Sequence, residues 1–360
     1  MTDGVGGEGS GPGSSLAEVI ETQRLGCELA GSPMYSDVLT AVAADVAAGG
    51  VCGRVLTPFR HAPFGDAILL RLLGAVHLAV LDGRAPVLAR HYPSVGGEPG
   101  PDLGRDFVAT VAHLEAEVVA AMAAGVQTNE VGRSAALLAG YLEVAGLGLP
   151  MRVFEVGASA GLNLWFDRYR YEVSDGSAAF GPADSPLRFV DPWFGPAPDL
   201  GREVAVAERA ACDVAPIDPT ARAGRLRLRS YVWPDQPERR ARLDAALDAI
   251  AGTPMLVERA NAVDWLTARL AAPVPGTATV VVHSIMLQYL PPGDRRRLLA
   301  VVDEAGERAT VDAPVAWLRM EPGGDQAEIR LTTWPGSTAR VVARSSFHGP
   351  PVVLAQPARL

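Results

Sequence analysis

The fold is decided by residues 151–164, which have the sequence Met-Arg-Val-Phe-Glu-Val-Gly-Ala-Ser-Ala-Gly-Leu-Asn-Leu. An apolar run ends in Glu155, and a turn of small residues follows that contains Gly157, Ser159 and Gly161. β-Branched and aromatic side chains favour a strand, and glycines let the backbone of a turn approach a ligand closely. We therefore predict a strand, a tight turn and the start of a helix, whose first amides are free to bind a ligand.

Strand-like and helical segments alternate along the chain from this point. Apolar runs typical of strands occupy residues 151–156, 204–212, 255–258, 279–283 and 315–320. Helical patterns lie between them, near residues 160–168, 239–250, 265–270 and 294–302. Such alternation predicts right-handed crossovers and a largely parallel sheet, so the fold class is α/β with five βα units. The turn after the first strand then faces the crevice in which such sheets bind ligands.

The chain ends with a different pattern. Residues 327–333 and 339–345 have strand-like sequences, and Trp334-Pro-Gly-Ser337 joins them without an intervening helix. Two strands joined by a short turn that contains glycine predict an antiparallel hairpin. With the five preceding strands, we expect a sheet of seven.

The region before the first strand is expected to be helical. Apolar residues recur at intervals of three and four between Leu16 and Leu147, and no convincing strand precedes Met151. The first residues are rich in Gly and Ser, which predicts a disordered tail. The predicted organisation is a tail at 1–15, a helical region at 16–148 and an α/β domain at 149–360, with an inserted hairpin and loop at about 169–201.

The composition argues against several classes of protein. The 360 residues carry a net charge of −9, whereas proteins that bind nucleic acid usually present a basic surface. Three cysteines that lie far apart favour neither a disulfide framework nor a structural zinc site. There is no signal-peptide pattern and no apolar run of about 20 residues. We therefore expect a cytoplasmic protein with a small-molecule substrate and no nucleic-acid or membrane partner; the sequence sets no oligomeric state.

Three interpretations of the turn at residues 157–161 compete. The first is a tight connection between strand and helix that requires small residues. The second is a dinucleotide site, but Ser159 stands where the middle glycine of G-x-G-x-x-G is expected. The third is the nucleophile elbow of a hydrolase, because the turn also matches G-x-S-x-G. A serine hydrolase would combine Ser159 with Asp312 and His348, but helices rather than several strands precede the turn.

The run Glu155-x-Gly157-x-Ser159-x-Gly161 resembles the first motif of class I S-adenosylmethionine-dependent methyltransferases, with Ser159 in place of a customary glycine. The resemblance covers about residues 150–348. It implies a Rossmann-like sheet of the methyltransferase type, with seven strands. It also implies that these four residues bind S-adenosylmethionine as a cofactor.

Three downstream segments are similar to later motifs of the same family. Residues 212–216 resemble the end of the second strand, which implies that Asp213 holds the ribose hydroxyls. Asn261 and Ala262 lie in a segment that resembles the one contacting adenine. Residues 280–291 resemble the fourth strand and the turn that faces the methyl acceptor.

The position of Asp213 departs from the family pattern, because it lies far beyond the usual spacing of about 20 residues after the glycines. If Asp213 is not on the second strand, Asp175 or Glu172 is the substitute.

Several polar residues are candidates for the chemistry. Methyl transfer from a sulfonium depends mainly on alignment, and a general base helps when the acceptor carries a proton. His283, at the expected end of the fourth strand, is the candidate base, since an imidazole titrates near neutrality; alternatively, its ring bonds a backbone carbonyl. Arg133 is expected to bind the cofactor's carboxylate, or to form a surface ion pair. The residues expected at the acceptor pocket are Asn129, Glu130, Gln288, Tyr289 and Glu321. Alternatively, Gln288 and Tyr289 simply pack, and Glu321 caps a turn.

The whole chain also resembles a bacterial family defined as domain of unknown function 2332. The segments that carry this resemblance are 126–133, 154–164, 231–236 and 317–322. The likeness implies a fold and a site but no reaction. We therefore expect an S-adenosylmethionine-dependent methyltransferase that acts on a small molecule. The alternatives are a serine hydrolase that uses Ser159, and a non-catalytic protein that binds an adenosyl ligand.

Overall fold

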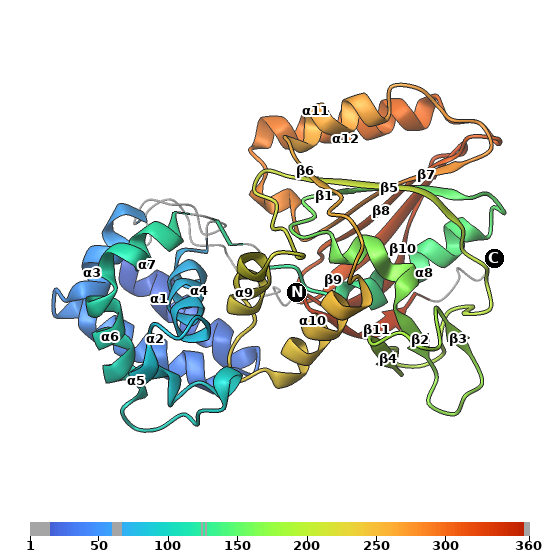
Figure 1. Cartoon of the computed structure of the whole chain (residues 1–360). Helices are drawn as coiled ribbons and strands as arrows, with labels where there is room; N and C mark the ends of the chain where they lie inside the picture. Colours follow the sequence, from blue (N-terminus) through green and yellow to red (C-terminus); the bar gives the residue numbers. More distant parts are fainter. Residues whose placement is uncertain (1–14, 60–66, 124, 127, 356–360) are drawn as a thin grey trace, which may run out of the picture. The chain divides into compact units, whose positions relative to one another are not determined.

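The computed structural model describes residues 15–59, 67–123, 125–126 and 128–355 of the chain (Figure 1). The predicted tail lies outside these residues, apart from Ser15. The chain forms two compact units. One comprises the residues up to Thr128 together with Ala221–Ala241, and the other comprises Asn129–Thr220 and the residues from Arg242 onward. In the described part, no single helix is long and apolar enough to cross a membrane.

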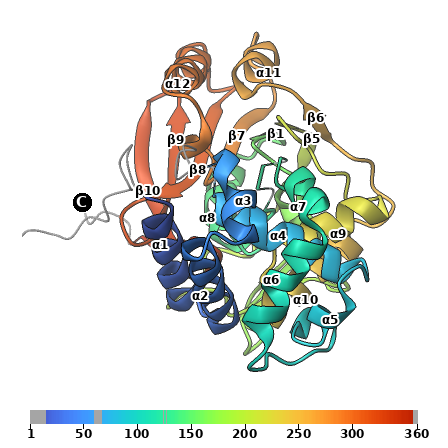
Figure 2. The same cartoon turned by 90° about the vertical axis from the view of Figure 1, so that its left-hand side faces the viewer.

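The first unit, called the helical unit, confirms the predicted N-terminal helical region. Its helix α1 (Leu16–Leu29) begins at a capping box, in which Ser15 and Glu18 each accept a hydrogen bond from the other's backbone amide. Helices α1 and α2 lie side by side (Figure 2), and buried side chains such as Leu39 and Leu72 form the core. The other helices are α2 (Pro33–Ala47), α3 (Val51–Leu56), η1 (Thr57–Phe59), α4 (Ile68–Leu81), α5 (Pro86–Ala89), η3 (Pro93–Val95), α6 (Leu103–His113), α7 (Glu115–Met122) and, from much later in the sequence, α9 (Arg222–Ser230).

The second unit, called the sheet unit, is built on a sheet that has eight strands in the described residues. These are β1 (Met151–Val156), β5 (Val206–Asp213), β6 (Val257–Arg259), β7 (Ala278–Ser284), β8 (Val315–Pro322), β9 (Ala327–Trp334), β10 (Thr338–Ser346) and β11 (Gly349–Leu354). Their order is β11-β10-β9-β8-β7-β1-β5-β6. The strands from β8 to β6 are parallel, and β9, β10 and β11 are antiparallel to their neighbours. The prediction of a mostly parallel α/β sheet with a C-terminal antiparallel hairpin is therefore confirmed.

The direction in which the parallel sheet grows reverses at β1. The chain builds outward from β1 through β5 to β6, and then returns to place β7 on the other side of β1. In open sheets of this kind, ligands bind outside the carboxyl ends of the strands at such a switch point. Here these ends are Val156 of β1 and Ser284 of β7.

Helices cover both faces of this sheet (Figures 1 and 2). They are α8 (Arg133–Ala145), η4 (Leu162–Arg168), α11 (Ala262–Arg269), η5 (Leu287–Tyr289) and α12 (Pro292–Glu307); α10 (Pro237–Ala249) begins in the helical unit and ends in the sheet unit. Phe154 of β1 lies in the same apolar cluster as Trp265 of α11 and Leu298 of α12. Since side chains alternate along a strand, Glu155 faces the opposite side, where α8 packs on β8 to β11.

Two details of the predicted sheet were wrong. In the described residues the large sheet has eight strands rather than seven, because β11 adds to the edge beside β10. Its two prolines argue against a strand, but an edge strand tolerates residues that cannot donate to a neighbour. The fifth βα unit is also missing, since β8 enters β9 directly through a turn in which Gly323 N donates to Gln326 O at 2.9 Å.

The segment predicted as an inserted hairpin and loop contains three short strands. These are β2 (Arg170–Glu172), β3 (Ala179–Phe180) and β4 (Arg188–Val190), which form a separate sheet in the order β3-β2-β4. Helix α8, predicted within the helical region, belongs to the sheet unit instead, where Gly140 lets Leu318 of β8 approach closely. The division therefore falls after Thr128 rather than after residue 148.

We expect Gly349→Ala to destabilise the sheet unit more than Gly336→Ala does. Both glycines have positive φ, 103° and 109°, so the backbone strain of the two substitutions is similar. A Cβ at Gly349 would overlap the backbone of Gly132, whereas a Cβ at Gly336 would meet open space. Urea unfolding should therefore show an additional loss of about 1–3 kcal/mol for Gly349→Ala. Equal losses would contradict the close approach of the two backbones.

Candidate functional site

The candidate site lies at the carboxyl ends of β1 and β7. The turn after β1 contains three residues with positive φ: Gly157 at 69°, Ser159 at 55° and Gly161 at 72°. The amides of Gly157 and Ala158 both donate to Cys212 O of β5, at 2.9 and 3.1 Å. Glycine adopts such φ values readily but serine does not, so the backbone at Ser159 is strained. The strand and tight turn predicted from the sequence are confirmed.

Glu155 is the next-to-last residue of β1 and is only 3% exposed. Its Oε2 atom has no hydrogen-bond partner among the described residues. Burial raises the pKa of Glu155 to about 8; the charge of Arg133 opposes this shift and that of Asp213 adds to it. A buried acceptor without a donor is costly. The carboxyl group is therefore mostly protonated at neutral pH and suited to a ligand that brings a cationic donor.

Asp213 is the last residue of β5, the second strand of the large sheet along the chain. Its Oδ2 accepts a hydrogen bond from Ser159 N and its Oδ1 accepts one from Ala215 N, both at 2.8 Å. The small sheet of β2 to β4 lies between β1 and β5 in the sequence, which explains the long spacing. Asp213 therefore needs no substitute from Asp175 or Glu172. Its carboxylate fixes the turn after β1, and the ribose-binding role stays a prediction.

The segment that leads into α8 is tied to the same turn. Asn129 Oδ1 accepts a hydrogen bond from Leu162 N at 3.0 Å. Asn163 Nδ2 donates to Glu130 O at 3.4 Å, and Ser134 Oγ donates to Asn163 Oδ1 at 2.7 Å. The structure thus brings Asn129 and Glu130 to the site, where these bonds hold the turn after β1 against α8.

Arg133, the first residue of α8, connects β7 to the turn between β10 and β11. Its Nε donates to Phe347 O at 3.0 Å, and its Nη1 donates to Ser284 O at 3.2 Å. The same guanidinium lowers the pKa of Glu155. Arg133 therefore brings a positive charge to the site, and its role in binding the cofactor's carboxylate stays a prediction.

His283 is wholly buried near the end of β7. Its Nδ1 is 2.7 Å from Glu321 Oε1, and Trp317 Nε1 donates to its Nε2 at 3.1 Å. An indole N–H only donates, so the proton of a neutral ring is assigned to Nδ1, which donates to Glu321. With both ring nitrogens engaged, His283 offers no position for a substrate proton. This geometry does not favour the predicted general-base role and makes His283 a residue that orients Glu321.

The loop after β7 carries the other predicted acceptor contacts. Gln288 and Tyr289 lie in η5 and are exposed. Met286 is buried, and the position of a Cβ on Gly157 would lie 3.0 Å from Met286 Cβ. Met286 therefore covers the turn after β1. The sequence placed Met286 in the segment expected to face the acceptor but did not single it out, because methionine is typical of ordinary cores.

Asn261 and Ala262 lie at the carboxyl end of β6, beyond β5 from Glu155. Asn261 Oδ1 accepts from Val263 N at 2.8 Å and so caps α11. Ala260 N donates to Asp213 O at 3.1 Å, which joins this segment to the end of β5. The two residues share the carboxyl edge of the sheet with Asp213, and their contact with adenine stays a prediction.

The hydrolase triad is not assembled around Ser159. Its Oγ is buried and has no hydrogen-bond partner among the described residues. Asp312 is exposed and precedes β8, where its carbonyl accepts from Gly276 N ahead of β7. Asp312 thus lies at the amino ends of the parallel strands and Ser159 at their carboxyl ends. His348 lies in the turn between β10 and β11.

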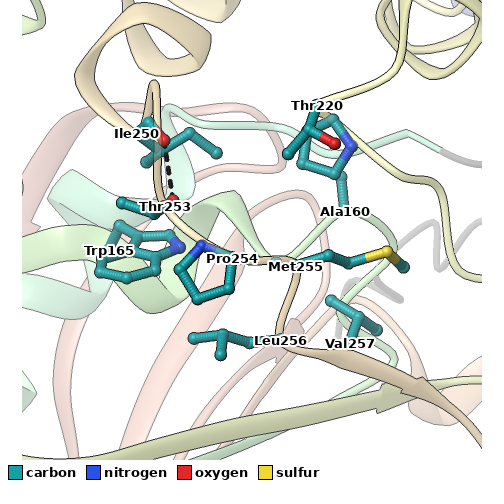
Figure 3. A pocket seen from close by; sticks show the side chains of 11 residues that line it. Ala160, Trp165, Thr220, Ile250, Thr253, Pro254, Met255, Leu256 and Val257 are labelled. Carbon is teal, nitrogen blue, oxygen red and sulfur yellow. Dashed lines mark hydrogen bonds between the residues drawn. The ribbon is translucent and has the colours of Figure 1, made fainter.

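Two hollows in the sheet unit are not lined by Glu155. Figure 3 shows one behind the turn, where Trp165, Pro254 and Val257 surround a cavity of about 10 Å³. A cavity of this size holds about one water molecule, which is far too small for an adenosyl group. The other, of about 600 Å³, lies between Pro150 and Arg202 at the amino ends of β1 and β5. The first cavity is lined in part by Ala160 and Gly161 of the turn after β1, whereas the second lies at the opposite edge of the sheet.

No metal centre is evident in the part of the chain that the structure describes. No group of three or more His, Cys, Asp or Glu side chains there is arranged to hold a metal ion. Cys27, Cys52 and Cys212 are buried and free. Burial raises the pKa of the Cys212 thiol to about 12, so this cysteine beside the turn is not a thiolate nucleophile.

We expect Glu155 to make the protein less stable as the pH rises from about 5 to 9. The unfolded carboxyl has an ordinary pKa of about 4.3, whereas the folded one has a pKa of about 8. The folded state therefore keeps a proton that the unfolded state loses. The stability that Glu155 contributes in this way is fully present below the pKa of the unfolded state. It is lost as the pH rises through the pKa of the folded state. Glu155→Gln should remove the loss, which is about 1.4 kcal/mol for each unit of the shift.

The free energy of unfolding in urea is measured at pH 5 and pH 9 for the wild type and for Glu155→Gln. Glu304→Gln, which changes an exposed carboxyl on α12, is the matched control and should keep the pH dependence of the wild type. Parallel losses in the wild type and Glu155→Gln would show that Glu155 ionises freely in the folded protein.

Comparison with known proteins identifies a family but no reaction. A family model described as an uncharacterized protein conserved in bacteria, DUF2332, matches residues 17–353. No curated protein matches the chain. The match includes the helices of the helical unit, the turn after β1 and the strands through β10. The chain therefore belongs to the DUF2332 family.

Proposed function

We propose that this protein is an S-adenosylmethionine-dependent methyltransferase that acts on a small molecule. The observation that supports the proposal most directly is the buried carboxyl of Glu155, which has an unpartnered oxygen at the switch point of the parallel sheet. Open α/β sheets bind their ligands at such points. The resemblance of residues 155–161 to the first methyltransferase motif suggests the class of ligand.

The unpartnered oxygen of Glu155 fits the ammonium group on the methionine part of this cofactor. An ammonium donor would supply the missing hydrogen bond and favour the carboxylate, because charge-assisted bonds are the stronger ones. In our proposal the cofactor's own carboxylate lies toward Arg133, whose charge already acts on Glu155. Binding would then release the proton that Glu155 holds at neutral pH.

The remaining contacts would come from the neighbouring strand ends. Each oxygen of Asp213 accepts a hydrogen bond from the backbone, and a carboxylate oxygen can accept more than one, so ribose hydroxyls could bind there too. Asn261 and Ala262, after β6, would lie toward adenine. Gly157, Ser159 and Gly161 would present backbone rather than side chains to the ligand, as their positive φ values allow.

When bound, S-adenosylmethionine supplies an electrophilic methyl group, so the chain's residues need mainly to align the acceptor and exclude water. Gln288, Tyr289 and Glu321 are the proposed acceptor contacts. Because both ring nitrogens of His283 are engaged, this imidazole does not serve as a base in our proposal. The site therefore suits an acceptor atom that carries no proton at neutral pH, such as a thiolate or a pyridine-type nitrogen.

We expect wild-type protein to bind S-adenosylhomocysteine, which keeps the ammonium, carboxylate, ribose and adenine groups. Glu155→Gln should weaken binding by about tenfold or more, because it removes a charged acceptor. Calorimetry at pH 7 in two buffers of different ionisation enthalpy should also detect proton release for the wild type and none for the variant.

Glu304→Gln serves again as the control and should bind like the wild type. The absence of heat at high micromolar ligand, with folded wild-type protein, would end the methyltransferase proposal. A non-catalytic protein that binds an adenosyl ligand would give the same calorimetric result. It would differ from a methyltransferase in transferring no methyl group from labelled cofactor to any acceptor.

The hydrolase alternative has its own test. We expect a serine-directed fluorophosphonate to leave the protein unlabelled, since Ser159 Oγ is buried and no base contacts it among the described residues. Labelling that disappears in Ser159→Ala, followed by mass spectrometry of the peptide, would favour the hydrolase instead.

A further inference from the structure

We infer that Met286 closes the ligand site and that Glu321 is the positioning residue that keeps Met286 in place. The inference rests on the proposed function for the identity of the ligand. The part that concerns Glu321 depends only on the protein and is tested without a ligand.

The contact between Met286 and the turn after β1 is close and buried. A Cβ built on Gly157 would lie 3.0 Å from Met286 Cβ and 3.3 Å from its Cγ and Cε. The whole methionine side chain therefore lies over the glycine at which a ligand would approach the backbone. Met286 is 8% exposed, so it fills this space rather than extending into solvent. A ligand that contacts Gly157 must displace it.

The backbone beneath Met286 is fixed by one carboxylate. Glu321 Oε1 accepts hydrogen bonds from Met286 N at 3.1 Å and Leu287 N at 3.3 Å. The same oxygen accepts from His283 Nδ1 at 2.7 Å, and His283 is in turn fixed by the indole of Trp317. Three donors on one oxygen orient the carboxylate, so a buried chain from β8 through β7 sets the position of the loop.

The rest of the loop is held at its ends. Arg295 of α12 donates to Leu287 O through Nε at 3.0 Å and Nη2 at 2.7 Å. Ile285 has a φ of 50°, which is rare for a β-branched residue and is retained only where the surroundings enforce it. Its amide donates to Met320 O at 2.8 Å. The loop is thus strained and clamped, whereas the unbranched Met286 side chain can change rotamer without moving it.

These contacts give Glu321 and Met286 different roles in the site. Glu321 is not needed to touch the cofactor, because its hydrogen bonds act on the loop. Met286 controls access to Gly157, and its removal should open the site without disturbing the clamp.

The first experiment measures amide hydrogen exchange of the peptide that covers residues 285–290, with no ligand present. Glu321→Gln should raise its exchange rate by about tenfold or more, since a charged acceptor for two amides is weakened. Met286→Ala should leave this exchange near the wild-type rate. Unchanged exchange in Glu321→Gln would overturn the positioning role, whatever the ligand proves to be.

The second experiment measures the association rate of S-adenosylhomocysteine by stopped flow. Met286→Ala should associate faster than the wild type by about tenfold, while Met286→Leu, which keeps the volume, should stay close to the wild type. Val274→Ala removes a partly exposed apolar side chain that precedes the amino end of β7, and it controls for a general effect of losing such a side chain.

Faster association with Met286→Ala than with the wild type would support the closed site. Equal association rates for the wild type and Met286→Ala would overturn it. If neither protein binds, the adenosyl-ligand proposal and the role of Met286 both fail, and the exchange experiment still decides the role of Glu321.

Discussion

A carboxyl group buried at the carboxyl end of β1 without a donor for one of its oxygens is the constraint on which the rest of the site depends. Because successive side chains of a strand point to opposite faces of the sheet, Glu155 points away from the apolar cluster around Phe154 and toward the face that α8 covers. Burial there raises its pKa to about 8. A protein keeps such a group at a cost in stability, and a ligand that supplies a cationic donor would offset that cost.

The neighbours of Glu155 stabilise the surrounding backbone. Arg133 bonds the carbonyls of Ser284 and Phe347, so it joins β7 to the last turn of the sheet. Asp213 bonds the amide of Ser159, and so fixes the turn after β1 to β5. The backbone around the switch point is therefore rigid. Side chains above it, Met286 foremost, are the parts that can move when a ligand enters.

Much of the fold could be predicted because it depends on local periodicity. The alternation of apolar runs and helical stretches was enough to predict parallel strands, and the turn after β1 was visible in its small residues. The strand β11 was missed, because a Gly-Pro-Pro start is unfavourable everywhere except at a sheet edge. Helix α8 was assigned to the wrong unit, since its sequence shows that it is helical and apolar but not which surface covers it.

By itself, the sequence determined the strands of the parallel sheet, that Glu155 and Asp213 lie near the carboxyl ends of two of them, and that a turn of small residues follows the first. These properties follow from neighbours within a few residues. Only the tertiary structure decided that both nitrogens of His283 are occupied, that Glu321 bonds the loop after β7, and that Met286 lies on Gly157. Those contacts join residues that are more than 30 positions apart or lie on different strands, and no local pattern specifies a hydrogen-bond partner across a sheet.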